Sequence, residues 1–250
     1  MSLFRSRSPR PADGDRLQIA GVTVRLSVNP RARRVSLRVD RARFEVVAVA
    51  PSPRKLAEAV AFAHQREAWM AQQMADIPEQ ILLAPGQTLT LFGRPAVLGV
   101  TPGRPRRLVD PTGGPDRIVA PAKDDDGEAW RAAILRLLKR EALAGLSRRT
   151  QTYAAALKQP MPKVGVADTR SRWGSCRPAR RGHQAAIRYS WRVMLAPPAI
   201  ADYLCAHECA HLVRADHSPK FWEVVATLNG DPTPHRAWLR QHGANLHGIG

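Results

Sequence analysis

The residues that could do chemistry in this chain of 250 residues are concentrated in His207-Glu208-Cys209-Ala210-His211, followed by His217. Residues four apart lie on one face of a helix, so His207 and His211 can bind one metal ion together. Glu208 lies beside them, where its carboxylate can take a proton from a metal-bound water molecule. Three protein ligands leave one tetrahedral position open for water, which is the arrangement of a catalytic zinc site rather than a structural one.

Two helices must position these side chains. Pro197-Pro198 predicts the start of the helix that carries the motif, because proline suits the first turn. Ser218-Pro219 predicts the start of the next helix, which places His217 in the turn between them, where it can fold back as the third ligand. Asp216 and Glu223 are the alternative third ligands. The non-functional alternative is a partly buried helix whose histidines only pack or bond to the backbone.

The second strong feature of the sequence is its positive charge. The net charge is +18, and residues 131–192 hold 15 Lys or Arg against only Glu141 and Asp168. Such a concentration attracts polyanions. It indicates either a nucleic acid or an acidic protein substrate near the site, or else arginine enrichment that only solvates a surface. No sequence motif of nucleic-acid recognition accompanies it.

Hydropathy and cysteine content indicate the compartment. No window of about eighteen apolar residues is present, so we expect no membrane span. The first residues are basic and lack the apolar centre of a secretory signal. Cys176, Cys205 and Cys209 cannot form a disulfide framework, so a cytoplasmic location is expected. Cys205 and Cys209 share a helical face turned away from the histidines, which predicts small buried side chains.

The order of elements predicts an α+β fold with a mostly β amino-terminal half. We expect a basic disordered arm at 1–17, a β-rich part at 18–122 and a catalytic part at 123–250. No internal repeat is evident. The expected elements of the first two parts are strands at 22–28, 35–39 and 44–49, a helix at 53–75, a hairpin with strands at 89–91 and 96–98, and a Pro, Gly and Asp-rich loop at 101–127.

The carboxy-terminal half is predicted to be zincin-like, with a long helix at 128–157, a small antiparallel sheet and the HExxH helix. The strands of that sheet are expected at 164–166 and 185–195, separated by a basic turn at 177–182. The last helix is expected to open at Thr233-Pro234 and to end at Gly243. Because an extended peptide can pair with a sheet edge beside the metal, we expect the strand at 185–195 to be that edge.

Several further motifs resemble one known family. They are Arg33-Arg34-Val35-Ser36-Leu37-Arg38-Val39, Leu91-Phe92-Gly93-Arg94, Arg172-Trp173-Gly174-Ser175-Cys176, Trp191-Arg192 and His217-Ser218-Pro219-Lys220-Phe221-Trp222. Together with the histidine motif they resemble the YgjP-like metallopeptidase family, which is related to the SprT-like zinc proteases. The resemblance covers roughly residues 20–245. It implies zinc ligands at His207, His211 and His217 and a catalytic base at Glu208. Ser190 stands where the family usually carries asparagine.

The function expected from these observations is zinc-dependent hydrolysis of peptide bonds in a protein or peptide substrate, with Glu208 as general base. The first alternative is a basic DNA- or RNA-associated factor, which could be a protease acting on protein bound to nucleic acid, with a non-catalytic metal site. A second is a zinc hydrolase of a non-peptide amide or ester. The sequence does not identify the group that stabilises the oxyanion; the candidates are Tyr189, Tyr203, His183 and His235.

Overall fold

The computed structural model describes residues 10–40, 43–75, 80–122, 127–169 and 172–250. Its chain forms two compact units, Met1–Pro78 and Glu79–Gly250. Most of the arm expected at 1–17 lies outside the described residues, and the first strand begins at Arg16. The division expected after residue 122 does not coincide with this boundary, because the strands between residues 88 and 120 share a core with the long helix that follows them.

The first unit is a four-stranded sheet with two helices. Its strands are β1 (Arg16–Ile19), β2 (Val22–Val28), β3 (Ser36–Asp40) and β4 (Glu45–Ala50), in the order β1-β2-β4-β3. β2 and β4 are parallel, and the other two pairs are antiparallel. The 3-10 helix η1 (Pro53–Lys55) leads into α1 (Leu56–Gln65) and α2 (Glu67–Ala75), so the helix expected at 53–75 is interrupted at Arg66.

The second unit begins with a sheet of the same topology. Its strands are β5 (Thr88–Leu91), β6 (Arg94–Val100), β7 (Arg106–Leu108) and β8 (Asp116–Ala120), in the order β5-β6-β8-β7. The hairpin of β5 and β6 was expected. The expectation of a loop over 101–127 was wrong, because β7 and β8 lie in this segment. Strand β7 has only three residues, and its polar composition gives no alternating pattern.

The two sheets reveal a structural repeat that the sequence analysis did not detect. Both have an antiparallel hairpin, then a parallel pair, then an antiparallel edge strand. Both hairpins turn through a residue with positive φ followed by glycine. Five residues of the first sheet region have an identical residue in the second, always the same number of positions later in the sequence. Gly14, Leu17, Gly21, Leu26 and Val28 correspond to Gly86, Leu89, Gly93, Leu98 and Val100. These matches are too few to stand out without the matching topology.

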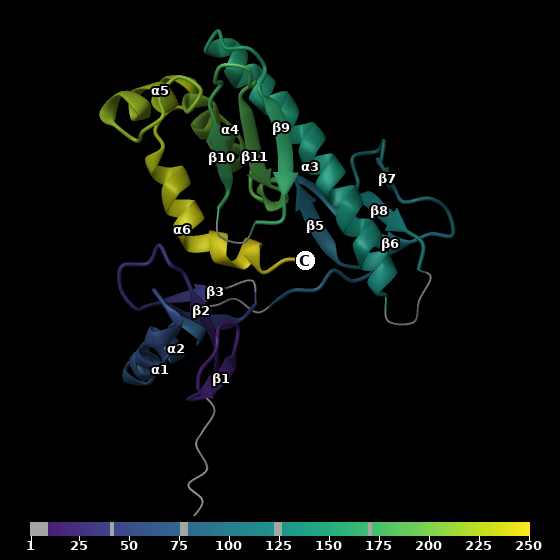
Figure 1. The fold of residues 1–250 in the computed structure, drawn as a ribbon. Helices are drawn as coiled ribbons and strands as arrows, with labels where there is room; N and C mark the ends of the chain where they lie inside the picture. The colour runs from purple at the N-terminus through teal and green to yellow at the C-terminus, as the bar shows by residue number, and fades with distance from the viewer. Residues whose placement is uncertain (1–9, 41–42, 76–79, 123–126, 170–171) are drawn as a thin grey trace, which may run out of the picture. The chain divides into compact units, whose positions relative to one another are not determined.

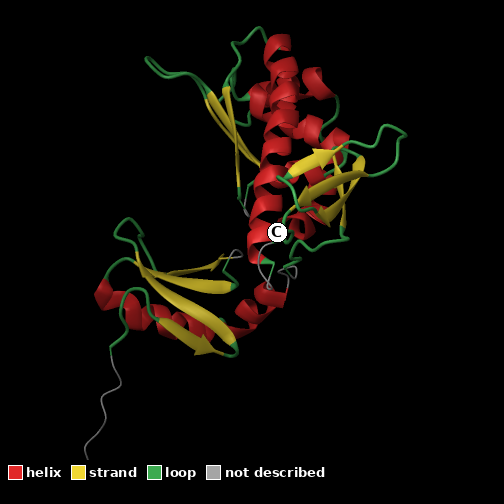
Figure 2. Cartoon of the chain, turned by 90° about the vertical axis from the view of Figure 1, so that its right-hand side faces the viewer, coloured by secondary structure: helices red, strands yellow, loops and turns green. Residues whose placement is uncertain are grey.

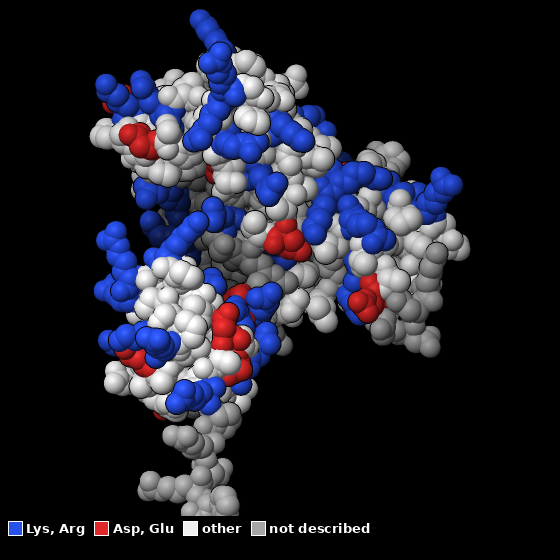
Figure 3. Space-filling model, in the orientation of Figure 1, with Lys and Arg blue, Asp and Glu red and all other residues white. Residues whose placement is uncertain are grey.

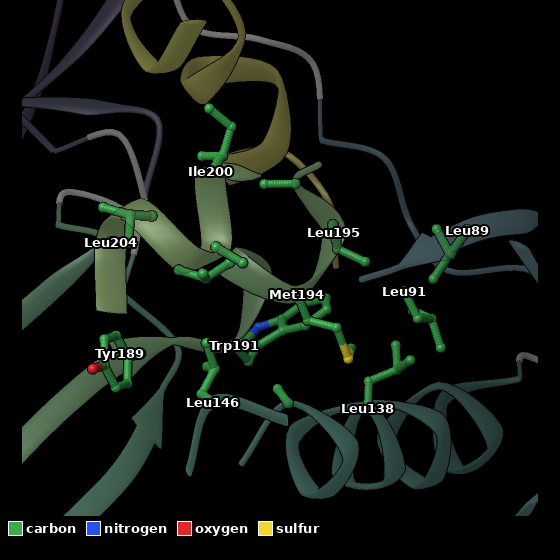
Figure 4. Close-up of a cluster of buried hydrophobic side chains, with 14 of the residues drawn as sticks. Leu89, Leu91, Leu138, Leu146, Tyr189, Trp191, Met194, Leu195, Ile200 and Leu204 are labelled. Atoms are coloured by element: carbon green, nitrogen blue, oxygen red, sulfur yellow. The ribbon is translucent and has the colours of Figure 1, made fainter. Parts of the chain in front are cut away.

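A long helix, α3 (Glu128–Ala156), organises the core of the second unit, as its apolar spacing predicts. Leu138 and Leu146 from α3 join one buried cluster with Leu91 of β5 and Tyr189 and Met194 from the segment before the motif helix (Figure 4). Figure 2 shows the strands between residues 163 and 190 on one side of this helix. The β5–β8 sheet and the histidine-bearing part therefore share one hydrophobic core.

The third sheet contains β9 (Lys163–Ala167), β10 (Gly174–Arg177) and β11 (Ala186–Ser190), in the order β10-β11-β9. β10 is antiparallel to β11, but β9 is parallel to it, so the expectation of an antiparallel sheet was wrong. The expectation that the strand at 185–195 forms the edge was also wrong. β11 is central, and residues 191–195 form the 3-10 helix η2 (Trp191–Leu195) instead. β10, which the sequence analysis did not predict, is an edge strand.

Three helices complete the second unit: α4 (Pro198–Ala210), α5 (Pro219–Asn229) and α6 (Thr233–His247). Figure 1 shows α4 behind β10 and β11. Helix α6 continues through Gly243, which was expected to end it. A Cβ atom at that glycine would lie 3.1 Å from Cζ2 of Trp173, so the glycine permits close packing rather than a stop. None of the described helices is long and apolar enough to cross a membrane.

Candidate metal centre

The amino-terminal end of α4 is held by the β5–β6 turn. The backbone N–H of Phe92 donates to the carbonyl of Met194 at 2.7 Å, and the Arg149 guanidinium lies 4.2 Å from the centre of the Phe92 ring. At Gly93, with φ +85°, an added Cβ would lie 2.8 Å from Cγ of Pro198, the first residue of α4. The Leu91-Phe92-Gly93-Arg94 motif therefore fixes where the motif helix begins.

Three imidazole rings converge at the other end of this helix. His207 lies in the last turn of α4, His211 directly follows it, and His217 lies in the turn before α5. One nitrogen from each ring lies within 4.8 Å of the others. Nε2 of His207 and Nε2 of His217 are 3.3 Å apart. Two nitrogens on one tetrahedral zinc ion, each at about 2.05 Å, are about 3.3 Å apart, so this spacing fits such an ion.

Hydrogen bonding and burial prepare these rings to bind a cation. Nδ1 of His211 donates to the carbonyl of Arg214 at 3.0 Å, which leaves Nε2 of that ring as the acceptor. Burial, with the neighbouring His211, His217 and Arg236, lowers the pKa of His207 to about 4, so the ring is neutral near pH 7. Its Nδ1 is buried and has no hydrogen-bond partner among the described residues.

The alternative ligands do not join the cluster. Among the described residues, the metal-capable group at this position contains only the three histidines. Oδ1 of Asp216 instead accepts a hydrogen bond at 2.8 Å from the hydroxyl of Ser218, the residue that precedes α5. Glu223 is exposed on α5. The three-histidine interpretation is therefore the one that the geometry favours.

Aromatic rings of α5 support the cluster. The ring centre of Phe221 lies 5.0 Å from that of His207 and 4.5 Å from that of His211. Trp222 lies 5.8 Å from both His207 and His217. Because Phe221 is fully buried in the main core, the turn that carries His217 is anchored directly after the histidine. The packing of α5 thus limits the conformations available to His217, although this histidine lies in a turn.

Glu208 is on the same helix and points into the space between α4 and β10. Its side chain is 5% exposed, and burial raises its pKa to about 7. The space exists because β10 has glycine at position 174: a Cβ there would lie 2.7 Å from both Cγ and Cδ of Glu208. The glycine of the Trp173-Gly174-Ser175-Cys176 motif therefore makes room for the carboxylate. Its sequence signal is a glycine inside a short strand, which often marks a close approach.

The four oxyanion candidates separate into two pairs. The hydroxyl of Tyr189 is buried and hydrogen-bonded to Thr150 at 2.9 Å, and His183 pairs with Arg180 at the exposed tip of the β10–β11 hairpin. Tyr203 and His235 stack on one another with ring centres 5.2 Å apart, and Tyr203 lies 6.0 Å from His207. Only this second pair lies near the histidine cluster.

One cation near the cluster was missed by the sequence analysis. Arg236 of α6 lies with its guanidinium 4.7 Å from the centre of the Trp222 ring, and its charge contributes to the lowered pKa of His207. Nothing in the sequence singles it out among 39 Lys and Arg residues. Its position depends on how α6 packs.

Comparison with protein families decides the kind of site. Residues 33–242 match the YgjP-like metallopeptidase domain. The chain belongs to the YgjP-like family. Its catalytic class is therefore that of a metallopeptidase, and the histidine cluster is a candidate site for the metal ion. No curated protein and no solved structure matches the chain significantly.

Buried cysteines and an internal ion pair complete the surroundings of the YgjP-like site. Cys205 and Cys209 are buried and free, as predicted. Arg192 of the Trp191-Arg192 motif is fully buried, pairs with Asp168, and donates to the carbonyl of Ile249 at 2.7 Å. Ser190, in the position of the family's asparagine, donates from its hydroxyl to the carbonyl of Thr169 at 3.3 Å. These contacts fix the segment between β11 and α4.

Proposed function

We propose that this chain is a zinc-dependent peptidase in which His207, His211 and His217 hold the metal ion and Glu208 is the general base. The observation that carries the proposal is the convergence of the three imidazoles within 4.8 Å, in a chain of the YgjP-like metallopeptidase family. A set of three neutral nitrogen donors suits zinc, and it leaves an open position as in catalytic zinc sites. The 3.3 Å separation of the Nε2 atoms of His207 and His217 and the paired Nδ1 of His211 support metal binding through Nε2 of these rings.

Glu208 would move the proton in this reaction. When bound, a zinc ion polarises the substrate carbonyl and lowers the pKa of water to near neutrality. Glu208 accepts the proton of the attacking water and passes it to the leaving amine. Its buried position between α4 and β10 supports this role, because burial raises its pKa to about 7, where a general base can take up a proton near neutral pH. Near His207, Tyr203, His235 and Arg236 are the groups that could stabilise the oxyanion.

The peptide would bind along the free edge of β10. The backbone N–H of Ser190 donates to the carbonyl of Trp173, so this pair is a hydrogen-bonded one. Alternation along an antiparallel pair then directs the backbone groups of Gly174 and Cys176 away from β11, toward the free edge. Main-chain hydrogen bonds at this edge would hold an extended substrate beside Glu208 largely independently of its sequence.

We also propose that the protein acts in the cytoplasm. All three cysteines are free in the structure, and Cys205 and Cys209 are buried. Burial raises the pKa of the Cys205 thiol to about 12, which makes it unreactive. Free thiols are typical of reducing compartments.

The test is hydrolysis of a quenched fluorescent peptide library by the zinc-loaded protein and by its Glu208→Gln variant. The variant should keep one metal ion per chain and lose at least about 100-fold in kcat, the usual contribution of a general base. Unchanged hydrolysis in the variant would remove Glu208 from the mechanism. Absence of peptide cleavage, together with cleavage of simple amides or esters, would favour a non-peptide hydrolase. Absence of any hydrolysis, with tight salt-sensitive DNA or RNA binding, would favour the nucleic-acid-associated factor.

A further inference from the structure

The face of the β9–β11 sheet that points away from α4 carries an open basic hollow. Its volume is about 480 Å³, and no acidic residue lines it. Three exposed cations line it, Lys163, Arg177 and Arg188, and we call this set the basic face. Figure 3 shows Lys and Arg side chains gathered over these strands. The small Ala186 lies between Arg177 and Lys163 in the sheet register, which opens the space between the two cations.

These cations differ from the arginines that stabilise the fold. Structural arginines of this chain have carboxylate partners: Arg192 pairs with Asp168, and Arg107 pairs with Asp116. The three cations of the basic face make no ion pair with any carboxylate of the described residues. Clustered like charges repel one another, so the folded chain gains nothing from them by themselves. An anionic partner would remove this repulsion.

The basic face lies along the path that a bound peptide would follow. Arg177 is on the edge strand β10, three residues after Gly174, which contacts Glu208. At about 3.3 Å per residue, its Cα lies about 10 Å along the strand from that of Gly174, the residue of β10 that packs against Glu208. Side chains alternate between faces, so Ser175 and Arg177 share the outer face while Gly174 and Cys176 share the inner one. Arg188 is the register partner of Ser175.

We propose that the basic face selects peptide substrates with an acidic side chain about three residues from the scissile bond. The inference rests on the proposed function. A substrate residue lying beside Arg177 on the added strand presents its side chain to the same outer face, about 5 Å away at Cβ. A carboxylate there meets Arg177 directly and is attracted at longer range by Arg188, which lies one strand further away on β11. A Lys or Arg at the same position would be repelled by both.

The shape of the face favours a peptide carboxylate over a nucleic acid. No aromatic side chain lines the hollow, so it offers no surface for stacking bases. Of the three cations, only Arg177 lies on the β10 edge; Arg188 is on the central strand β11, and Lys163 is on β9 at the opposite edge. The positive charge therefore extends across the strands, away from the β10 edge, and not along that edge. This arrangement suits a single acidic side chain of the added strand better than a row of phosphates.

The experiment compares three matched series of peptides in which Asp, Gln or Lys is scanned through the positions around one cleavage site. The wild-type protein should show the highest kcat/KM for Asp about three residues from that site. Arg177→Glu should lower kcat/KM about tenfold for the Asp peptide and raise it for the Lys peptide. Arg54→Glu, an equal change of charge at an exposed residue of the other unit, is the matched control and should change none of these values.

The outcomes separate this inference from the proposed function. Equal cleavage of the Asp, Gln and Lys peptides would overturn the inference while leaving the peptidase in place. Absence of cleavage of every peptide would overturn both. Equal effects of Arg177→Glu and Arg54→Glu would attribute the preference to the electrostatic field of the whole protein and would also overturn the inference. If Arg177→Glu folds poorly, Arg177→Gln replaces it, and kcat/KM for the Asp peptide should then fall about fivefold. A peptide series without charge preference, combined with salt-sensitive oligonucleotide binding that Arg177→Glu abolishes, would assign the face to nucleic acid instead.

Discussion

Replacing Gly174 with alanine tests whether the position of Glu208 controls catalysis. The added Cβ would lie 2.7 Å from both Cγ and Cδ of Glu208, whereas carbon atoms in contact are about 3.5 Å apart. The carboxylate must therefore move by roughly 0.8 Å. A displacement of about 1 Å at a catalytic group can cost about 100-fold in rate, so we expect kcat to fall by about this factor.

The same substitution should affect stability much less than activity. The clash involves the outer part of a side chain that can rotate, so the free energy of unfolding should fall by no more than about 3 kcal/mol. The assay is peptide hydrolysis at saturating substrate, with metal content and urea unfolding measured on the same preparation. Gly165→Ala in β9 is the matched control, because a Cβ at that position meets nothing within 4 Å. Full activity of a metal-loaded, folded Gly174→Ala protein would refute the reasoning.

Two further predictions concern the elements that support the site. Gly93→Ala should destabilise the protein by about 1–3 kcal/mol more than Gly86→Ala, because both have positive φ but only Gly93 would contact Pro198; equal unfolding midpoints in urea would contradict this. Asp116 is buried, and although burial acts to raise its pKa, hydrogen bonds led by that from Arg107 hold it below the usual value. Its stabilising contribution is therefore present above about pH 4 and is lost as the pH falls through the lowered pKa. Asp116→Asn should cost about 3–5 kcal/mol at pH 7, and urea titrations should show that the difference from wild type shrinks in acid; a difference independent of pH would contradict the ion-pair account.

The histidine cluster is the part of the site that the sequence predicts best, because it depends on local spacing. Helical periodicity places His207 and His211 on one face, and the proline that starts the next helix limits where His217 can lie. Helix α3 was predicted from the local spacing of its apolar residues, and α5 from Ser218-Pro219 at its start. These features need no information about how distant parts of the chain pack.

The parts that the sequence did not predict depend on long-range pairing. Strand β10 is four residues of small and polar character, so it shows no alternation, and its place as an edge strand follows from pairing with β11. The parallel pairing of β9 with β11 likewise depends on the connection between them, which passes through β10. The contact between Gly174 and Glu208 depends both on the local helix that carries Glu208 and on long-range strand pairing, since it forms only when the sheet packs on α4.

Glycine was the residue type whose role was hardest to assign from the sequence. Gly230 is the C-cap of α5, whereas Gly243, which was expected to end the last helix, lies inside α6, where it makes room for Trp173. A turn and a close approach both require glycine, and only the packed structure distinguishes them.

The central claim is that three imidazoles bind one catalytic metal ion, and the most direct test is zinc analysis with X-ray absorption spectroscopy of the purified protein. The account predicts one zinc ion per chain with three imidazole nitrogens at about 2.0–2.1 Å. It also predicts loss of the metal in His207→Ala, His211→Ala and His217→Ala, and retention in Asp216→Ala. Full zinc occupancy in His217→Ala, or a coordination shell containing fewer than three imidazoles, would contradict it.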